Sequence, residues 1–166
     1  MEPKGIIVAG VNGYGSALDQ FKSPTGIFLD NNDVLYSADS SNHRVVKWMP
    51  GASSGQIVAG GNENGQNANQ FNYLSSIVSD KKGIMFICDR ENDRVQKCLP
   101  NDNQGQTIIQ NLSCWGVAMD KEESSYVFHF REHYVLKWPA NQVVAGGNGE
   151  GENVDQLAYP SQLFVD

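Results

Sequence analysis

Three segments of this sequence repeat one another, and this repetition limits the possible fold more than any other feature. The segment VAGVNGYGSALDQF (8–21) matches VAGGNENGQNANQF (58–71) at an offset of 50 residues, and it recurs as VAGGNGEGENVDQL (144–157). Self-similarity at a period of roughly 40–50 residues is the signature of a repeat architecture. The chain is therefore expected to fold as a series of similar units.

Each glycine-rich segment is followed by a second repeated block, which is PTGIFLD (24–30) in its first copy and has counterparts at 74–80, 114–120 and 160–166. A third block follows, LYSADSSNHRVVKW (35–48), with counterparts at 85–98 and 125–138. The last two copies of the third block are only 40 residues apart, because the glycine-rich segment is missing after residue 110. The repeat unit is thus conserved in its strands and variable in one loop.

Each unit is predicted to contain four strands, which in the first unit are 26–29, 34–38, 44–48 and 56–59. The short Asn- and Ser-rich turns between the first three strands favour antiparallel hairpins. Four short strands per unit are typical of a propeller blade. We therefore predict an all-β partial β-propeller as a single domain over 1–166, with three four-stranded antiparallel blades at 22–71, 72–112 and 113–158. A single outer strand is expected within 5–21, at Ile6–Ala9, and a single inner strand within 159–166, at Leu163–Val165.

The third block also carries a recognisable motif, in which Asp39, Asn42, Arg44 and Val45 are spaced as Asp-x-x-Asn-x-Arg-Val. The second unit repeats this motif at 89–95. With Pro24 and Gly26 placed before it, the motif resembles the NHL repeat, and the resemblance extends over essentially the whole chain. It implies a β-propeller, commonly one with six blades.

The third unit departs from this motif, because it has HFREHYV at 129–135, without the aspartate, the asparagine or the arginine. We expect this blade to keep its packing and to lose the polar network of its turn. In the other two blades the motif residues are interpreted as structural. The aspartate and asparagine suit a tight turn, and the arginine can pair with a carboxylate. These structural residues are Asp39, Asn42, Asp89 and Asn92.

A binding surface is predicted where the turns between the second and third strands of each blade emerge, on the same face as the glycine-rich loops. The candidate binding residues on this face are His43, Arg44, Asp93, Arg94 and His133. Proteins that resemble NHL propellers use such faces to bind other proteins or, in some cases, single-stranded RNA. The net charge of −7 repels a phosphate backbone and so favours a protein, peptide or glycan over nucleic acid.

The function predicted from the sequence is a non-catalytic interaction module, and the chain is predicted not to be an enzyme. No cofactor, metal site or catalytic residue is predicted. Two alternatives follow from the resemblance. The chain could belong to a metal-dependent propeller enzyme, similar to amidating lyases or gluconolactonases, or it could be the substrate-recognition part of a RING-type ubiquitin ligase. Three blades cannot close a ring, so a fragment of a longer propeller protein is expected, or self-association that completes the ring.

Other features narrow the function further. The glycines at 10, 13 and 15 follow an apolar strand, as in a dinucleotide-binding loop. A protein needs such a loop once, however, and this segment occurs three times, so nucleotide binding is not expected. No apolar run approaches the roughly 20 residues that span a membrane. The localisation is left open. The three cysteines form no disulfide framework or zinc motif, so Cys88, Cys98 and Cys114 are expected to be free thiols.

Overall fold

The computed structural model describes residues 5–102 and 104–165, and its strands form three separate four-stranded antiparallel sheets. The first sheet contains β1 (Pro24–Leu29), β2 (Leu35–Asp39), β3 (Arg44–Trp48) and β4 (Gln56–Gly60). The second contains β5 (Leu74–Ser79), β6 (Met85–Asp89), β7 (Arg94–Cys98) and β8 (Gly105–Gln110). The third contains β9 (Cys114–Met119), β10 (Ser125–His129), β11 (Tyr134–Trp138) and β12 (Gln142–Gly146). In each sheet the strands lie in chain order.

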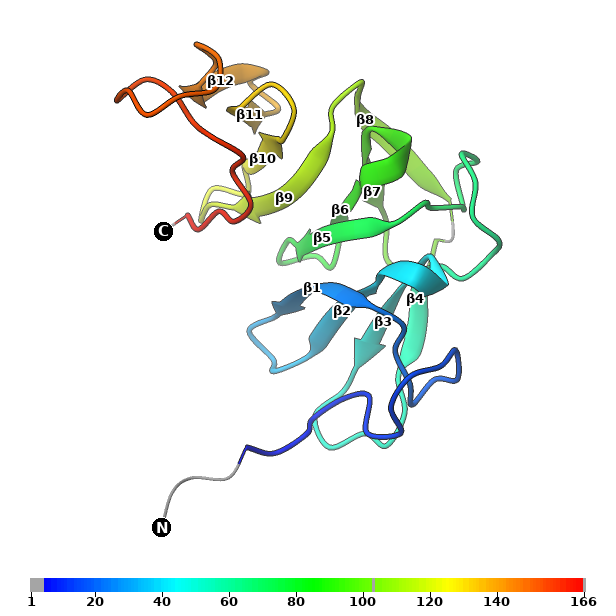
Figure 1. Ribbon diagram of the computed structural model, residues 1–166. Helices are drawn as coiled ribbons and strands as arrows, with labels where there is room; N and C mark the ends of the chain where they lie inside the picture. Colours follow the sequence, from blue (N-terminus) through cyan, green and yellow to red (C-terminus); the bar gives the residue numbers. More distant parts are fainter. Residues whose placement is uncertain (1–4, 103, 166) are drawn as a thin grey trace.

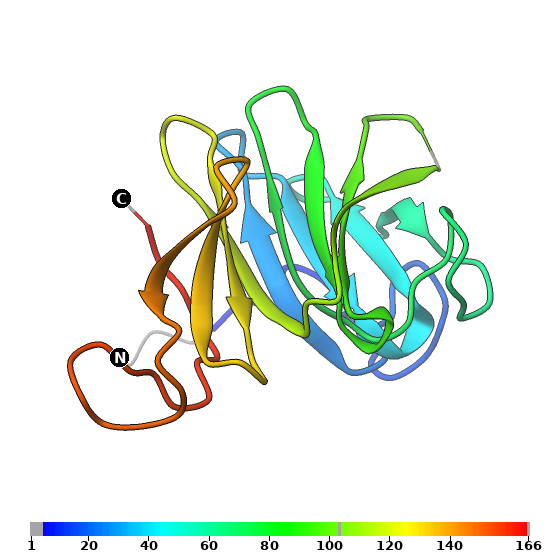
Figure 2. The same cartoon turned by 90° about the horizontal axis from the view of Figure 1, so that it is seen from above.

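The sheets stand side by side as blades 1, 2 and 3 (Figures 1 and 2). Their first strands lie together, with β5 between β1 and β9. The all-β fold class and the three predicted blades are confirmed. The third strand of blade 1 begins and ends at the predicted residues, and no other boundary in this blade differs by more than two residues. No α-helix is found in the described part of the chain, so no helix there is long and apolar enough to cross a membrane.

The single strands expected at Ile6–Ala9 and Leu163–Val165 are not present as strands. A strand exists through its ladder of hydrogen bonds, and among the described residues no neighbouring strand pairs with either segment. The apolar side chains of Ile6 and Phe164 are consequently exposed, at 87% and 85%.

Apolar side chains from neighbouring blades form the core. One cluster joins blades 1 and 2 through residues such as Ala38, Val45, Leu74 and Ile87, all of them fully buried. A second cluster joins blades 2 and 3, and Trp138 packs against Phe86 there with ring centroids 5.7 Å apart. Trp138 thus lies at the junction between two blades. Blade 3 keeps its packing, as predicted.

The expectation of three free thiols is wrong for two of the cysteines. Cys88 on β6 and Cys114 on β9 are joined by a disulfide between blades 2 and 3, with Cα atoms 5.3 Å apart. Cys98 is free and buried, and burial raises the pKa of its thiol to about 12. Spacing along the chain gave no indication of this pairing, because the two cysteines become neighbours only when the blades pack together.

We expect reduction of this disulfide to destabilise the protein by about 3 kcal/mol, since the bond closes a loop in the unfolded chain across a sequence separation of 26. Urea unfolding with and without reductant measures the loss. A Cys114→Ala variant serves as the control and should show no response to reductant. Thiol titration of the unreduced, denatured protein should detect Cys98 alone, and detection of all three thiols would contradict the assignment.

Candidate functional site

The predicted binding face lies at the ends of the blades where the second and third strands of each sheet are joined. In blades 1 and 2 these turns are short 3-10 helices, η1 (Ser40–Asn42) and η2 (Arg90–Asn92). Each turn ends in a residue with left-handed backbone geometry: φ is 51° at His43, 48° at Asp93 and 55° at His133. These three candidate residues therefore occupy equivalent positions in successive blades, as their alignment in the sequence predicts.

The Asp-x-x-Asn-x-Arg motif forms a clamp that holds the glycine-rich loop preceding its own blade. In blade 1, Oδ2 of the fully buried Asp39 accepts hydrogen bonds from Asn42 Nδ2 at 2.8 Å and from Arg44 Nε at 2.7 Å. Oδ1 of the same carboxylate accepts the backbone N–H of Lys22 at 2.7 Å. The terminal nitrogens of Arg44 then donate to the backbone carbonyls of Ser16 and Ala17, at 2.7 and 3.0 Å.

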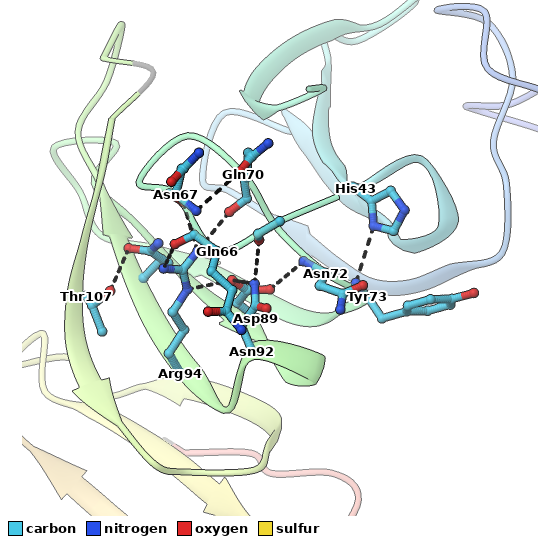
Figure 3. Close-up of polar contacts among 12 residues, drawn as sticks. His43, Gln66, Asn67, Gln70, Asn72, Tyr73, Asp89, Asn92, Arg94 and Thr107 are labelled. Carbon is cyan, nitrogen blue, oxygen red and sulfur yellow. Dashed lines mark hydrogen bonds and ion pairs between the residues drawn. The ribbon is translucent and has the colours of Figure 1, made fainter. Parts of the chain in front are cut away.

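Blade 2 contains the same clamp, which Figure 3 shows in detail. Asp89 accepts hydrogen bonds from Asn92 and Arg94, and Arg94 donates to the carbonyls of three residues of the 61–71 loop. These carbonyls belong to Gln66, Asn67 and Gln70, at 2.7, 3.0 and 2.9 Å. Burial raises the pKa of the Asp89 carboxyl, although the hydrogen bonds from Asn72, Asn92 and Arg94 act in the opposite direction.

In blade 3, His129 replaces the clamp aspartate, and Tyr134 stands in place of the arginine. His129 Nδ1 accepts the backbone N–H of Glu132 at 3.2 Å, and the imidazole also hydrogen-bonds to the backbone of Asn111. Asn111 belongs to a connection of only three residues, 111–113, between β8 and β9, so no glycine-rich loop precedes this blade. The predicted loss of the polar network in this blade is confirmed, and it coincides with the loss of the loop that the network would hold.

The histidines at the turn ends contact the next blade through an aromatic neighbour. His43 Nδ1 accepts the backbone N–H of Tyr73 at 3.4 Å, and His133 Nδ1 accepts that of Tyr159 at 3.2 Å. In both pairs the rings meet edge to face, with centroids 5.7 and 4.9 Å apart. Asp93 differs, because its Oδ2 pairs with the exposed Arg131 at 3.2 Å while its buried Oδ1 has no hydrogen-bond partner among the described residues.

A row of aromatic side chains crosses the same face between blades 2 and 3, and the sequence reasoning missed it. Trp115 stacks on Phe130 with centroids 5.0 Å apart, and the guanidinium of Arg90 lies 4.0 Å from the Trp115 ring centroid. Phe130 also contacts Tyr159, at 5.5 Å. The repeat carried a usable signal, since the residue before the second repeated block is tyrosine at both 73 and 159.

The structure therefore divides the five candidate binding residues into two groups. Arg44 and Arg94 direct their guanidinium groups at loop carbonyls, and their side chains are 6% and 11% exposed. They position the loops. His43 and Asp93 are half-buried and contact Tyr73 and Arg131. His133 is buried, with a side chain 11% exposed, and packs against Tyr159 at the end of the aromatic row. Within 5–102 and 104–165, no three His, Cys, Asp or Glu side chains are grouped so that they could hold a metal ion.

No protein-family model matches this sequence, and no curated protein matches it either. Solved structures do resemble the fold. A streptogramin B lyase superposes on 72% of this chain with a TM-score of 0.52 and 13% identity. Selenomethionine-substituted virginiamycin B lyase from Staphylococcus aureus superposes on 76%, with a TM-score of 0.55 and 5% identity. The catalytically inactive form of that lyase, crystallised with quinupristin, covers 74% at a TM-score of 0.53 and 10% identity.

This chain has a β-propeller fold. At these identities the likeness shows the fold alone, and the chain spans only about two fifths of the length of the lyases, between 39% and 42%. The prediction that the chain is not an enzyme is contradicted by these neighbours, because they are enzymes built on the same architecture. A β-propeller architecture does not separate catalytic from non-catalytic proteins.

Replacing Arg94 with methionine should destabilise the protein by about 3–5 kcal/mol, because the change leaves the buried Asp89 carboxylate without its counter-charge. Urea unfolding measures the effect. Arg131→Met is the matched control: it removes an ion pair whose arginine is 66% exposed, so its cost should stay below about 1 kcal/mol. Equal unfolding midpoints for the two variants would contradict the clamp.

The stability of the protein should fall as the pH drops below roughly 6.5, the ordinary pKa of histidine. Burial lowers the pKa of both His43 and His129, so the unfolded chain takes up protons at a pH where the folded chain does not. The stabilising effect is present above pH 6.5 and is lost progressively as the pH falls through the folded-state pKa values.

Urea unfolding between pH 7.5 and 5 tests this dependence. The double variant His43→Gln/His129→Gln is the control, since glutamine can still accept a backbone N–H but does not titrate. Its free energy of unfolding should decline less with falling pH than that of the unmodified protein. Parallel declines would show that the two histidines are not responsible.

Proposed function

We propose that this chain is a segment of an NHL-type propeller whose face at η1, η2 and residues 130–133 recognises a protein, peptide or glycan ligand. The observation that carries the proposal is the aromatic row of Trp115, Phe130 and Tyr159 with Arg90 against it. Tryptophan, tyrosine and arginine are the residue types that dominate binding interfaces, because they offer large apolar surfaces with a polar end. Here they come together on one face from two neighbouring blades.

The support for the NHL assignment comes from the clamp. Its Asp-x-x-Asn-x-Arg residues recur in register in blades 1 and 2 and perform the same structural task in both. By fixing the glycine-rich loops, the clamps set the height and outline of the proposed binding face. Arg44 and Arg94 thus serve recognition indirectly, while His43, Asp93 and His133 border the surface that a ligand would contact.

Exposure of the aromatic side chains adds to this support. Tyr73 and Tyr159 are 48% and 54% exposed, and Trp115 and Phe130 are half-buried. Each ring is held on one side by the fold and keeps part of its surface open to a ligand. Because related propellers include lyases, the proposal covers ligands that the full protein converts as well as ligands that it only binds.

The proposal is tested by binding of the purified chain to a peptide array and a glycan array. We expect saturable binding to one class, with affinity reduced about tenfold or more in Trp115→Ala and Tyr159→Ala, as for aromatic residues at the centre of an interface. Met49→Ala, in the turn between β3 and β4 at the opposite end of blade 1 and 54% exposed, is the control and should bind normally.

Mass spectrometry of the bound ligand, recovered after incubation, shows whether it is converted. Either result is compatible with the proposed recognition. Two outcomes would overturn the proposal: no saturable binding on either array, or binding that Trp115→Ala, Tyr159→Ala and Met49→Ala all leave unchanged.

A further inference from the structure

A cavity of about 450 Å³ lies between blades 1 and 2, away from the proposed binding face. It is bordered by the whole of β4, by the turn between β5 and β6, and by the turn between β7 and β8. In antiparallel blades these two turns emerge at the end opposite to η1 and η2. The side chains that matter for its chemistry are Tyr36, Lys47, Gln56, Lys82, Met85 and Asp102.

The residue types at the two junctions between blades differ. The last residue of the third strand is Trp48 in blade 1, Cys98 in blade 2 and Trp138 in blade 3. Trp138 packs against Phe86 of the preceding blade. Phe86 is the counterpart of Tyr36. Cys98 offers a smaller side chain at this position, and it is buried with Tyr36 in the cluster that joins blades 1 and 2.

The charges around this cavity are unusual for so acidic a protein. Lys47 and Lys82 both border it, and neither forms an ion pair within the described part of the chain. The Lys47 amine lies 5.8 Å from the centroid of the Tyr36 ring. The bordering carboxylate, Asp102, accepts the backbone N–H of Gln104 at 2.9 Å within its own turn. Two cations thus face one opening in a chain whose net charge is −7.

The cavity wall carries apolar and polar surface, and the polar part is the larger. Ala59 and Met85 are almost fully buried behind it, and Ile57, which is 39% exposed, presents apolar surface to the opening. Burial, together with the nearby Asp30, raises the pKa of Tyr36, so its hydroxyl remains protonated and able to donate a hydrogen bond. A limited apolar surface beside two ammonium groups and a hydroxyl donor suits a molecule with one apolar and one anionic end.

We propose that the cavity between blades 1 and 2 binds a small anionic organic molecule, with its apolar part against Ile57 and its anionic group between Lys47 and Lys82. The size agrees with this, since small-molecule sites are commonly about 300–1,000 Å³. This site is separate from the proposed recognition face and does not depend on it.

The test uses 1-anilinonaphthalene-8-sulfonate, an aromatic anion that fluoresces when bound. We expect saturable binding to the native protein and an affinity about tenfold lower in Lys47→Met/Lys82→Met, which corresponds to about 1.4 kcal/mol. Lys97→Met is the matched control: Lys97 is the counterpart of Lys47 in blade 2, where Trp138 packs against Phe86 at the adjoining junction, and its loss should leave the affinity unchanged. N-phenyl-1-naphthylamine, which lacks the sulfonate, should be insensitive to all three substitutions.

Thermal unfolding of each variant verifies that it is folded. If the double variant does not fold, NMR of the unmodified protein decides, because the amide signals of Ala59 and Gly83 should shift on addition of the sulfonate while those of β12 do not. The proposal is overturned if no saturable binding occurs, if the double variant binds as tightly as the native protein, or if the shifts are spread over all three blades.

Discussion

In blades 1 and 2, a buried aspartate at the end of the second strand forms a salt bridge with the arginine opposite it, at the start of the third strand. This salt bridge determines how the glycine-rich loops are arranged. Asp39 with Arg44, and Asp89 with Arg94, each meet at 2.7 Å. The remaining guanidinium nitrogens point at loop carbonyls. Backbone carbonyls in a loop need hydrogen-bond donors when they are taken out of water. One arginine supplies several donors, so a long glycine-rich loop can lie flat on the blade.

The buried aspartate–arginine pair favours one conformation of the glycine-rich loop over the others. Taking two charges out of water is costly, and for Asp89 the cost is visible as a raised carboxyl pKa despite its hydrogen bonds. Once the pair is buried, however, any loop position that misses the arginine leaves charges and carbonyls without partners. The clamp therefore selects one loop conformation, and it does so in the same way in both blades that have a loop.

Much of the fold could be predicted from the sequence, because the period, the turn residues and the alternation of apolar side chains all indicate four-stranded blades. Recurrence once per blade predicts a structural role for Asp39, Asn42, Asp89 and Asn92, and the structure places all four in the clamps. The other two clamp residues, Arg44 and Arg94, are predicted as binding residues. The aromatic row, the disulfide and the cavity depend on what lies between blades. The structural roles of Trp115, Cys88 and Cys98 each depend on a contact with a residue that is distant in sequence. No local sequence pattern identifies that residue.

The repeat identifies the architecture of this protein but does not indicate whether the protein is catalytic. Repetition identifies a propeller, and the propeller architecture hosts binding proteins and enzymes alike. Residues that break the repeat are not explained by the architecture, and Trp115, Arg90 and Cys98 are such residues in this protein.

The two junctions between blades differ in how firmly they tie the chain together. Blades 2 and 3 share a disulfide, a tryptophan packed between them and a connection of only three residues. Blades 1 and 2 share an apolar cluster and the His43–Tyr73 contact, beside an unfilled space and a long loop. In a structure where each unit contacts only its neighbours, cooperativity is divided at the weaker junction. A covalent bond thus adds to the packing between blades 2 and 3, whereas blade 1 is held to blade 2 by packing and hydrogen bonds alone.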